Sequence, residues 1–399
     1  MVFSHVGLSA PKINLLGVGI DNKNIAVIIN TNDALSREIA KYYQEKHSIP
    51  DEHLFYVSLS TDKSEVSVGE FAVMKRILDS KLPKTVQAIV LTWASPYRVG
   101  CMSITSAFTF GFDQNYCASS CRLTAKSRYY GSSSRAPFTD HGIRPTMAVA
   151  ATSFDKAKQL IDRGAMAGGS INRATALLVS TSDKARNVRL PIFEKIKNNK
   201  LKGIDIKFIE ADVVRNQKDV MFYFTGQRFV EDINTNYYLP GAIADHLTSF
   251  GGRLVDSSQM SAIKWLELGL TGSYGTVVEP CSFPEKFPNP EIVINNYHSG
   301  ETLIEAYWKS VIMPGQGIFI GDPLAKPYND YSLIPTKKGY RLLSPYLKKG
   351  TYQLLGKNAL QDDFTLVNPK IVLGTHKKTV ELTEPLFNFY QLQAISSGK

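Results

Sequence analysis

The chain has 399 residues, of which 43% are hydrophobic and 21% are charged, and its formal net charge is +10. This length suits two or three compact units, and the composition excludes a disordered protein. The longest apolar runs have the length of a strand, so no membrane-spanning segment is expected.

The positive charge is concentrated at the C-terminus. Residues 331–399 contain ten Lys or Arg against four Asp or Glu. Several of them form lysine pairs spaced like exposed strand ends and turns, and no aromatic-rich RNA-binding signature accompanies them. We therefore expect no nucleic-acid partner. A solvated basic surface is the first interpretation, and a tail that binds an acidic envelope polymer is the alternative.

The first hundred residues alternate between strand and helix patterns. Buried strands are predicted at 25–30, 54–57 and 86–92, and helical spacing covers 36–43 and 69–82. Strands separated by helices of this length form right-handed βαβ units and a mainly parallel sheet. The sequence therefore predicts an α/β fold with a mainly parallel sheet flanked by helices.

Residues 100–146 interrupt this alternation, because they are rich in Ser, Gly, Tyr and Cys and have no sustained period. We expect a long excursion over the sheet edge or over a site. The α/β pattern then resumes, with strands at 147–150, 176–179, 206–209, 220–224 and 241–244, helices at 153–163, 191–198, 261–268 and 301–311, and a turn-rich segment at 271–277. From about residue 331 short strands follow without helices, at 352–355, 364–367, 371–373 and 379–382.

This pattern predicts three parts. Residues 1–160 form an N-terminal α/β half that includes the long excursion, residues 161–330 form a second α/β half, and residues 331–399 form a small all-β, sandwich-like domain.

The four cysteines are Cys101, Cys117, Cys121 and Cys281, and they allow two disulfides in three pairings. Three residues separate Cys117 from Cys121, whereas structural zinc sites typically have two between their cysteines. We expect disulfides or buried thiols, and neither a metal nor another cofactor. Disulfides favour export to a periplasmic or extracellular location, although the N-terminal residues lack the pattern of a signal peptide.

Five segments, at 140–146, 181–189, 240–252, 272–281 and 321–324, closely resemble a conserved bacterial protein family. That resemblance identifies relatives and implies no reaction. More distantly, a series of short motifs resembles the gingipain-type cysteine peptidases, which have a caspase-like fold of two halves. In chain order the series is 144–147, the helix at 153–163, 177–180, 222–226, 245–252, 268–273 and Gly321-Asp-Pro323.

The resemblance implies a vacant catalytic dyad. In gingipain-type peptidases one strand ends in a Gly-His-Gly turn and the next in a Cys, whereas here Thr225 falls near the His position and Ser249 or Phe250 near the Cys position. A cysteine peptidase requires a thiolate with a His in hydrogen-bond reach. We therefore expect a degenerate scaffold with a binding or structural role in the bacterial envelope. Thr225 and Ser249 should lie at the C-terminal ends of neighbouring strands.

The alternative is a hydrolase whose catalytic groups have moved. His246 and Ser249 lie three residues apart, with Asp245 adjoining, but neighbouring residues of a strand point to opposite faces, which disfavours a local triad. Cys281 is the other candidate nucleophile, with His141 or His246 as its base. A disulfided or buried Cys281 is the simpler interpretation.

Three loops that follow predicted strands, at 101–145, 181–189 and 273–290, are expected to converge over one cleft. Its polar lining would then be Asp140, His141, Asp183, Arg186, Glu279 and Cys281. Arg186 and Arg189 are candidates for clamping a carboxylate. Asp140, His141, Asp183 and Glu279 could hold a divalent metal only if the loops met, and their separation in sequence disfavours this. The expected ligand is a peptide or an envelope polymer.

Overall fold

A computed structural model describes residues 12–14, 19–118, 121–168, 171, 173–328, 332–343, 347, 349–358, 362–374, 379–387 and 389–395. The chain forms two compact units, Ile20–Tyr328 and a small β unit that combines Met1–Gly19 with Asn329–Lys399. Strand β1 (Lys12–Asn14) pairs with β20 (Phe389–Ala394), so the first residues belong to the small unit and not to the predicted N-terminal half. A three-residue strand carries no periodic signal that could have shown this.

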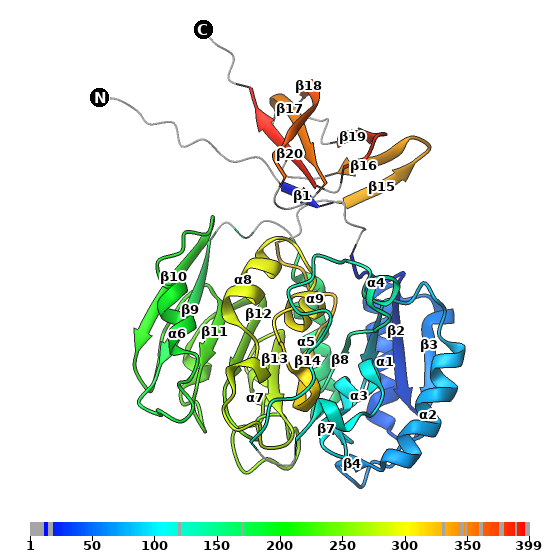
Figure 1. The fold of residues 1–399 in the computed structure, drawn as a ribbon, viewed down its shortest axis with the longest axis vertical. Coiled ribbons are helices and arrows are strands. Elements are labelled where there is room, and N and C mark those ends of the chain that lie inside the picture. The colour runs from blue at the N-terminus through cyan, green and yellow to red at the C-terminus, as the bar shows by residue number, and fades with distance from the viewer. Residues whose placement is uncertain are drawn as a thin grey trace. The chain divides into compact units, whose positions relative to one another are not determined.

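The larger unit is built on one ten-stranded, mostly parallel sheet, which confirms the predicted α/β class (Figure 1). The strand order is β10-β9-β11-β12-β13-β14-β8-β5-β2-β3. The bounds are β2 Ile25–Asn30, β3 Leu54–Val57, β5 Ala88–Leu91, β8 Thr146–Ala148, β9 Ala174–Ser180, β10 Ile204–Glu210, β11 Val220–Thr225, β12 Tyr238–His246, β13 Gly272–Thr276 and β14 Gly317–Gly321. β14 is antiparallel to β13, and one bridged residue pair joins it to β8. The two predicted halves therefore share one sheet.

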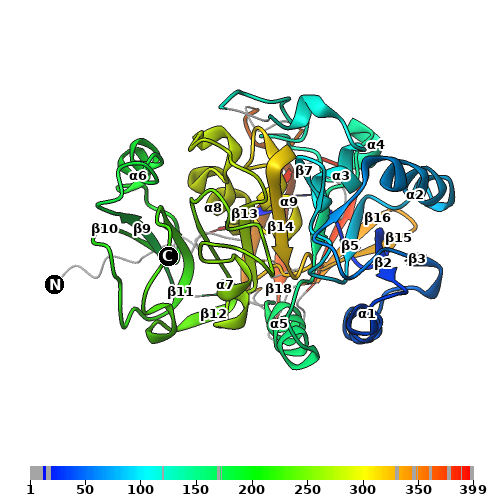
Figure 2. The same ribbon diagram turned by 90° about the horizontal axis from the view of Figure 1, so that it is seen from below.

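Helices cover both faces of this sheet (Figure 2). Their bounds are α1 Ala34–His47, α2 Val68–Lys81, α3 Ile104–Phe110, α4 Pro137–His141, α5 Phe154–Met166, α6 Leu190–Ile196, α7 Ile263–Glu267, α8 Pro290–His298 and α9 Leu303–Trp308. α1 and α5 pack together on one face, whereas α2, α3 and α9 lie on the other, where Phe110 contacts Trp308. Asp33, Ser67 and Ser153 accept hydrogen bonds from the first turns of α1, α2 and α5, which explains where these helices begin.

The Gly321-Asp-Pro323 motif anchors these layers at the amino ends of the first strands. The Asp322 carboxylate is buried and lies 2.8 Å from His47 Nε2, near the end of α1. It also accepts a hydrogen bond from the backbone of Leu324. A Cβ on Gly164 would lie 2.0 Å from the same carboxylate, so only glycine allows α5 to pack this closely.

The segment expected to be turn-rich, 271–277, contains the buried strand β13. Gly275 has no room for a side chain, because a Cβ there would lie 2.4 Å from the backbone of Gly251. The glycines of this segment thus serve close packing of a central strand and not a turn. Helix α8 and strand β14 were not predicted.

The small unit contains two antiparallel sheets, β1-β20-β17-β18 and β15-β16-β19. The further strands are β15 Ser332–Thr336, β16 Gly339–Leu343, β17 Gly350–Lys357, β18 Thr365–Leu373 and β19 Thr379–Thr383. Both sheets contribute to one core, made of Leu342, Leu347, Leu354, Leu373, Val380, Leu382, Tyr390 and Leu392. Shared burial of this kind is what a small sandwich requires. Four lysines of the basic tail, Lys348, Lys377, Lys378 and Lys399, lie outside the described residues.

No helix within the described part of the chain is both long and apolar enough to cross a membrane.

Candidate functional site

The carboxyl ends of β11 and β12 meet at the positions that the sequence analysis singled out. Thr225, the last residue of β11, is paired with His246, the last residue of β12. Leu247 then donates a backbone hydrogen bond of 2.9 Å to the Thr225 carbonyl, and Ser249 follows two residues later. Thr225 and Ser249 thus lie at the C-terminal ends of neighbouring strands, as predicted.

His246 is buried, and both of its ring nitrogens are engaged. Trp265 Nε1 donates to His246 Nδ1 at 2.9 Å, so the imidazole proton lies on Nε2, which donates to the Met260 carbonyl at 3.0 Å. Burial lowers the pKa of His246 to about 4, so the ring is neutral near pH 7. No lone pair is left to accept a proton from Ser249, and this corrects the proposal that the two residues act as a catalytic pair.

All four cysteines form disulfides, Cys101 with Cys117 and Cys121 with Cys281. The Cys281 sulfur is therefore not a free thiolate, and the hydrolase alternative built on it is wrong for this disulfide-bonded form. Glu279 accepts a 2.8 Å hydrogen bond from the Cys281 backbone, which shapes this loop.

His141 and Asp140 do not join this edge of the sheet. They end helix α4, where the Ser132 hydroxyl lies 2.9 Å from His141 Nε2 and the Ser134 hydroxyl donates to Asp140. The backbone of α4 donates to the Gln87 side chain, which precedes β5, so the helix lies at the amino end of that strand.

The prediction that three loops converge over one cleft is therefore wrong for the part of the loop at 101–145 that contains α4. The long excursion leaves the carboxyl end of β5, where Tyr97 donates a hydrogen bond to Asp256 beyond β12. It must then return to the opposite edge to enter β8 in the parallel direction. Within the described residues no three His, Cys, Asp or Glu side chains are grouped as a metal site.

Arg189 is a structural residue beneath the candidate site. Only 2% of its side chain is exposed, and it donates to the Asp245 carboxylate and, at 2.6 Å, to the Thr225 carbonyl. Burial raises the pKa of Asp245 to about 6, and the Arg189 guanidinium opposes that rise. Arg189 thus joins β11 to β12 and cannot clamp a ligand as predicted.

Three polar atoms around Arg189 form no hydrogen bond with the residues that the structure describes. Arg189 Nε, Asp245 Oδ2 and the Thr225 hydroxyl are buried and form no hydrogen bond with any described residue. Because the Thr225 hydroxyl donates to no base among the described residues, it is not activated as a nucleophile in this arrangement.

Arg186, in contrast, is partly exposed, and its orientation is fixed. Its Nε donates to Thr248 Oγ1 at 3.0 Å, and its Nη1 donates to Asp183 at 2.9 Å. Thr248 donates in turn to the Gln259 side chain at 2.7 Å. This chain of hydrogen bonds holds the guanidinium over the carboxyl ends of the strands, with 23% of the side chain exposed.

A glycine allows this arrangement. A Cβ on Gly226 would lie 2.0 Å from the Arg186 carbonyl, so the loop that carries Arg186 rests directly on the end of β11. Thr181, in the same loop, donates a hydrogen bond of 2.7 Å to the Gly226 carbonyl.

Two arginine–aromatic pairs lie in the loops that follow β11 and β12. The Arg228 guanidinium lies 5.3 Å from the Phe229 ring centre, and that of Arg253 lies 4.2 Å from the Phe250 ring centre. Together with Arg186 these four residues are called the carboxyl-edge surface here. Arg228, Phe229 and Arg253 were not predicted from the sequence, although the loops that follow the predicted strands at 220–224 and 241–244 contain them.

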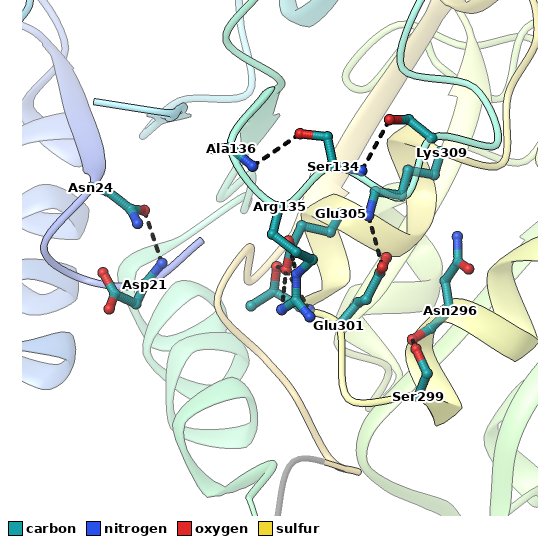
Figure 3. Close-up of polar contacts among 12 residues, drawn as sticks. Asp21, Asn24, Ser134, Arg135, Ala136, Asn296, Ser299, Glu301, Glu305 and Lys309 are labelled. Atoms are coloured by element: carbon teal, nitrogen blue, oxygen red, sulfur yellow. Dashed lines mark hydrogen bonds and ion pairs between the residues drawn. The ribbon is translucent and has the colours of Figure 1, made fainter. Parts of the chain in front are cut away.

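A second group of charges lies apart from this surface. Arg135 donates to both oxygens of Glu305, at 2.6 and 3.1 Å, and Lys309 lies 2.7 Å from Glu301 (Figure 3). The two pairs are buried and balanced in charge, and they fasten the end of the long excursion to helix α9 and the turn before it. We assign this group a structural role.

No family model matches the chain, and no curated protein matches it. Among solved structures it is similar to the crystal structure of the Arg-specific cysteine proteinase gingipain R, with a TM-score of 0.45, 10% identity and coverage of 94% of this chain and 92% of that chain. The complex of the Porphyromonas gingivalis RgpB pro- and mature domains gives a TM-score of 0.45, 9% identity and 94% coverage of both chains. The fold resembles the gingipain fold. The likeness concerns the fold alone.

Proposed function

We propose that this protein is a binding module that recognises a carboxylate-bearing ligand at the carboxyl-edge surface, on a scaffold that performs no peptidase chemistry. The observation that carries this proposal is the fixed, partly exposed Arg186 guanidinium. Its Nη2 group forms no hydrogen bond with any residue that the structure describes, so it can donate to an incoming oxygen. A planar guanidinium matches the two oxygens of a carboxylate.

The candidate catalytic groups support a binding role. Both ring nitrogens of His246 are engaged, Cys281 is cross-linked, and the Thr225 hydroxyl is buried. Acyl transfer requires a nucleophile and a base in mutual reach. None of these residues meets that requirement in this arrangement.

The other residues of the carboxyl-edge surface support an anionic ligand. Arg228 and Arg253 add positive charge, and Phe229 and Phe250 add apolar faces on which a sugar ring or a side chain can rest. Asp183 neutralises part of this charge, so we expect selective binding and not general attraction of anions.

The two disulfides suggest an exported protein, since such bonds persist in oxidising compartments. An envelope location would bring the carboxyl-edge surface into contact with acidic peptides and acidic polysaccharides.

Isothermal titration calorimetry with poly-L-glutamate, polygalacturonate and poly-L-lysine tests the proposal. We expect binding of at least one acidic polymer and none of poly-L-lysine. Arg186→Gln should weaken that binding about 10- to 100-fold, the loss expected for a charge-assisted hydrogen bond. The matched control is Lys184→Gln, which removes the same charge from an exposed residue of the same loop. Equal losses in both variants, or turnover of a peptide library by the native chain, would contradict the proposal.

A further inference from the structure

The ten-stranded sheet ends at β3, and no other strand in the described part of the chain pairs with its outer edge. Among the described strands β3 pairs only with β2. Its residues, Leu54-Phe-Tyr-Val57, include neither a charge nor a proline, and 64% of Tyr56 is exposed. Proteins usually protect edge strands with charges, prolines or a covering segment. The opposite edge strand, β10, follows this rule, because it carries Asp205, Lys207 and Glu210.

A groove of about 780 Å³ runs between β3 and helix α2. Its helical wall is one stripe of α2, formed by Gly69, Glu70, Val73, Met74, Ile77, Leu78 and Lys81. Val73 and Ile77, in the middle of the stripe, are 55% and 52% exposed. An apolar groove beside an unpaired strand provides both backbone and side-chain contacts for an added strand.

The charges at the two ends of the groove are opposite and lie symmetrically about its middle. β3 and β5 both run parallel to β2, so α2, which connects them, runs in the opposite direction. Glu70 therefore lies near the carboxyl end of β3, and Lys81 lies near its amino end. Neither side chain forms an ion pair with another described residue, whereas Lys75 and Asp79, elsewhere on the helix, pair with each other.

We propose that this face is a self-association surface, on which a second copy of the chain pairs its own β3 antiparallel to the first. A two-fold axis through the middle of β3 would place the amino end of one β3 beside the carboxyl end of the other. Lys81 of each copy then faces Glu70 of the other. The apolar residues between them, Val73 and Ile77, fill the groove from both sides.

This charge complementarity selects a second copy as the partner. A two-fold interface uses the same patch on both chains, so an acid at one end must meet a base at the other. The stripe meets that condition with Glu70 and Lys81. The sheets of the two copies would join into one continuous sheet.

Sedimentation velocity of the full chain over roughly 1 to 100 μM tests the proposal. We expect a monomer–dimer equilibrium that Glu70→Lys and Lys81→Glu each weaken about tenfold, because each change makes both symmetric contacts repulsive. An equimolar mixture of the two variants should recover the dimer, since one chain then carries lysine at both positions and the other carries glutamate at both. The double variant E70K/K81E should recover it as well.

Two further variants complete the test. Arg76→Glu changes a charge on another face of α2 and should leave association unchanged. Val73→Asp places a charge in the middle of the groove and should abolish the dimer, with circular dichroism used to confirm that the variant is folded. A chain that is monomeric at every concentration, or a dimer that tolerates V73D and both charge reversals, would overturn the proposal.

Discussion

The buried His246 should make the folded state sensitive to acid. Its pKa is lowered by burial from an ordinary value of 6.5 to about 4, so the unfolded chain binds a proton at a higher pH than the folded chain does. Stability is therefore lost as the pH falls from about 6.5 towards 4. Since one pH unit corresponds to about 1.4 kcal/mol, the full loss is about 3 kcal/mol.

A single substitution isolates this effect. Gln at position 246 can accept the Trp265 hydrogen bond through its oxygen and donate to the Met260 carbonyl through its nitrogen, but it does not titrate. The free energy of unfolding, measured by urea denaturation, should fall between pH 7 and pH 4.5 by about 2 kcal/mol more in the native chain than in His246→Gln. Other titrating groups are common to both chains, so the difference reports on His246.

Parallel curves for the two chains would refute this reasoning. They would mean that the ring is already protonated in the folded state, or that water reaches it. A His246→Gln variant that is fully unfolded at pH 7 would show instead that Gln cannot replace both hydrogen bonds, and His246→Asn would then be measured.

Three further outcomes are expected. Replacing Cys121 and Cys281 by Ser should lower the free energy of unfolding by up to about 5 kcal/mol, since the disulfide closes a separation of 160 residues; rapid alkylation of the native chain by iodoacetamide would contradict this. Glu305→Gln removes the negative charge that faces the buried Arg135 guanidinium and should cost about 3 to 5 kcal/mol in thermal denaturation, whereas a loss below about 1 kcal/mol would indicate a hydrated pair. Burial disfavours the charged form of His47, but the Asp322 carboxylate outweighs burial and raises the pKa of His47. Its stabilising contribution should therefore be complete below about pH 6.5 and be lost as the pH rises, so His47→Gln should lose least stability above neutrality.

The strands with continuous apolar runs were predictable because their signal is local. All six residues of β2, Ile25–Asn30, are buried, and any such run between turn residues favours a buried strand. β13 is equally buried but reads Gly-Ser-Tyr-Gly-Thr, and glycine disfavours strands. Its burial depends on contact with the backbone of residues 251–252, which no local pattern reveals. Helix α8 had a usable signal in Asn289-Pro290, a capping residue followed by proline.

The candidate site was predictable as far as strand order determined it. The positions of Thr225, Ser249 and the partly exposed Arg186 were predictable because each lies at or just after the end of a recognisable strand. The predicted position of His141 is wrong because its loop begins at the carboxyl end of β5 but must end at the opposite edge of the sheet to enter β8. The pairing of Cys121 with Cys281 joins segments far apart in the chain, and four cysteines allow three pairings that sequence alone cannot separate.

The bond between Cys121 and Cys281 also determines what a single break in the backbone would do. Any cut between these residues falls inside a covalently closed ring, so the two fragments stay attached to each other. A nicked molecule would migrate as one species until a reductant separated it into two. Because the attached fragments remain at a high effective concentration, local opening of the sheet that they share would be followed by reassembly within the same molecule. The ring includes the strands from β8 to β13, so the residues of the carboxyl-edge surface would stay covalently attached to the rest of the molecule after a cleavage within it.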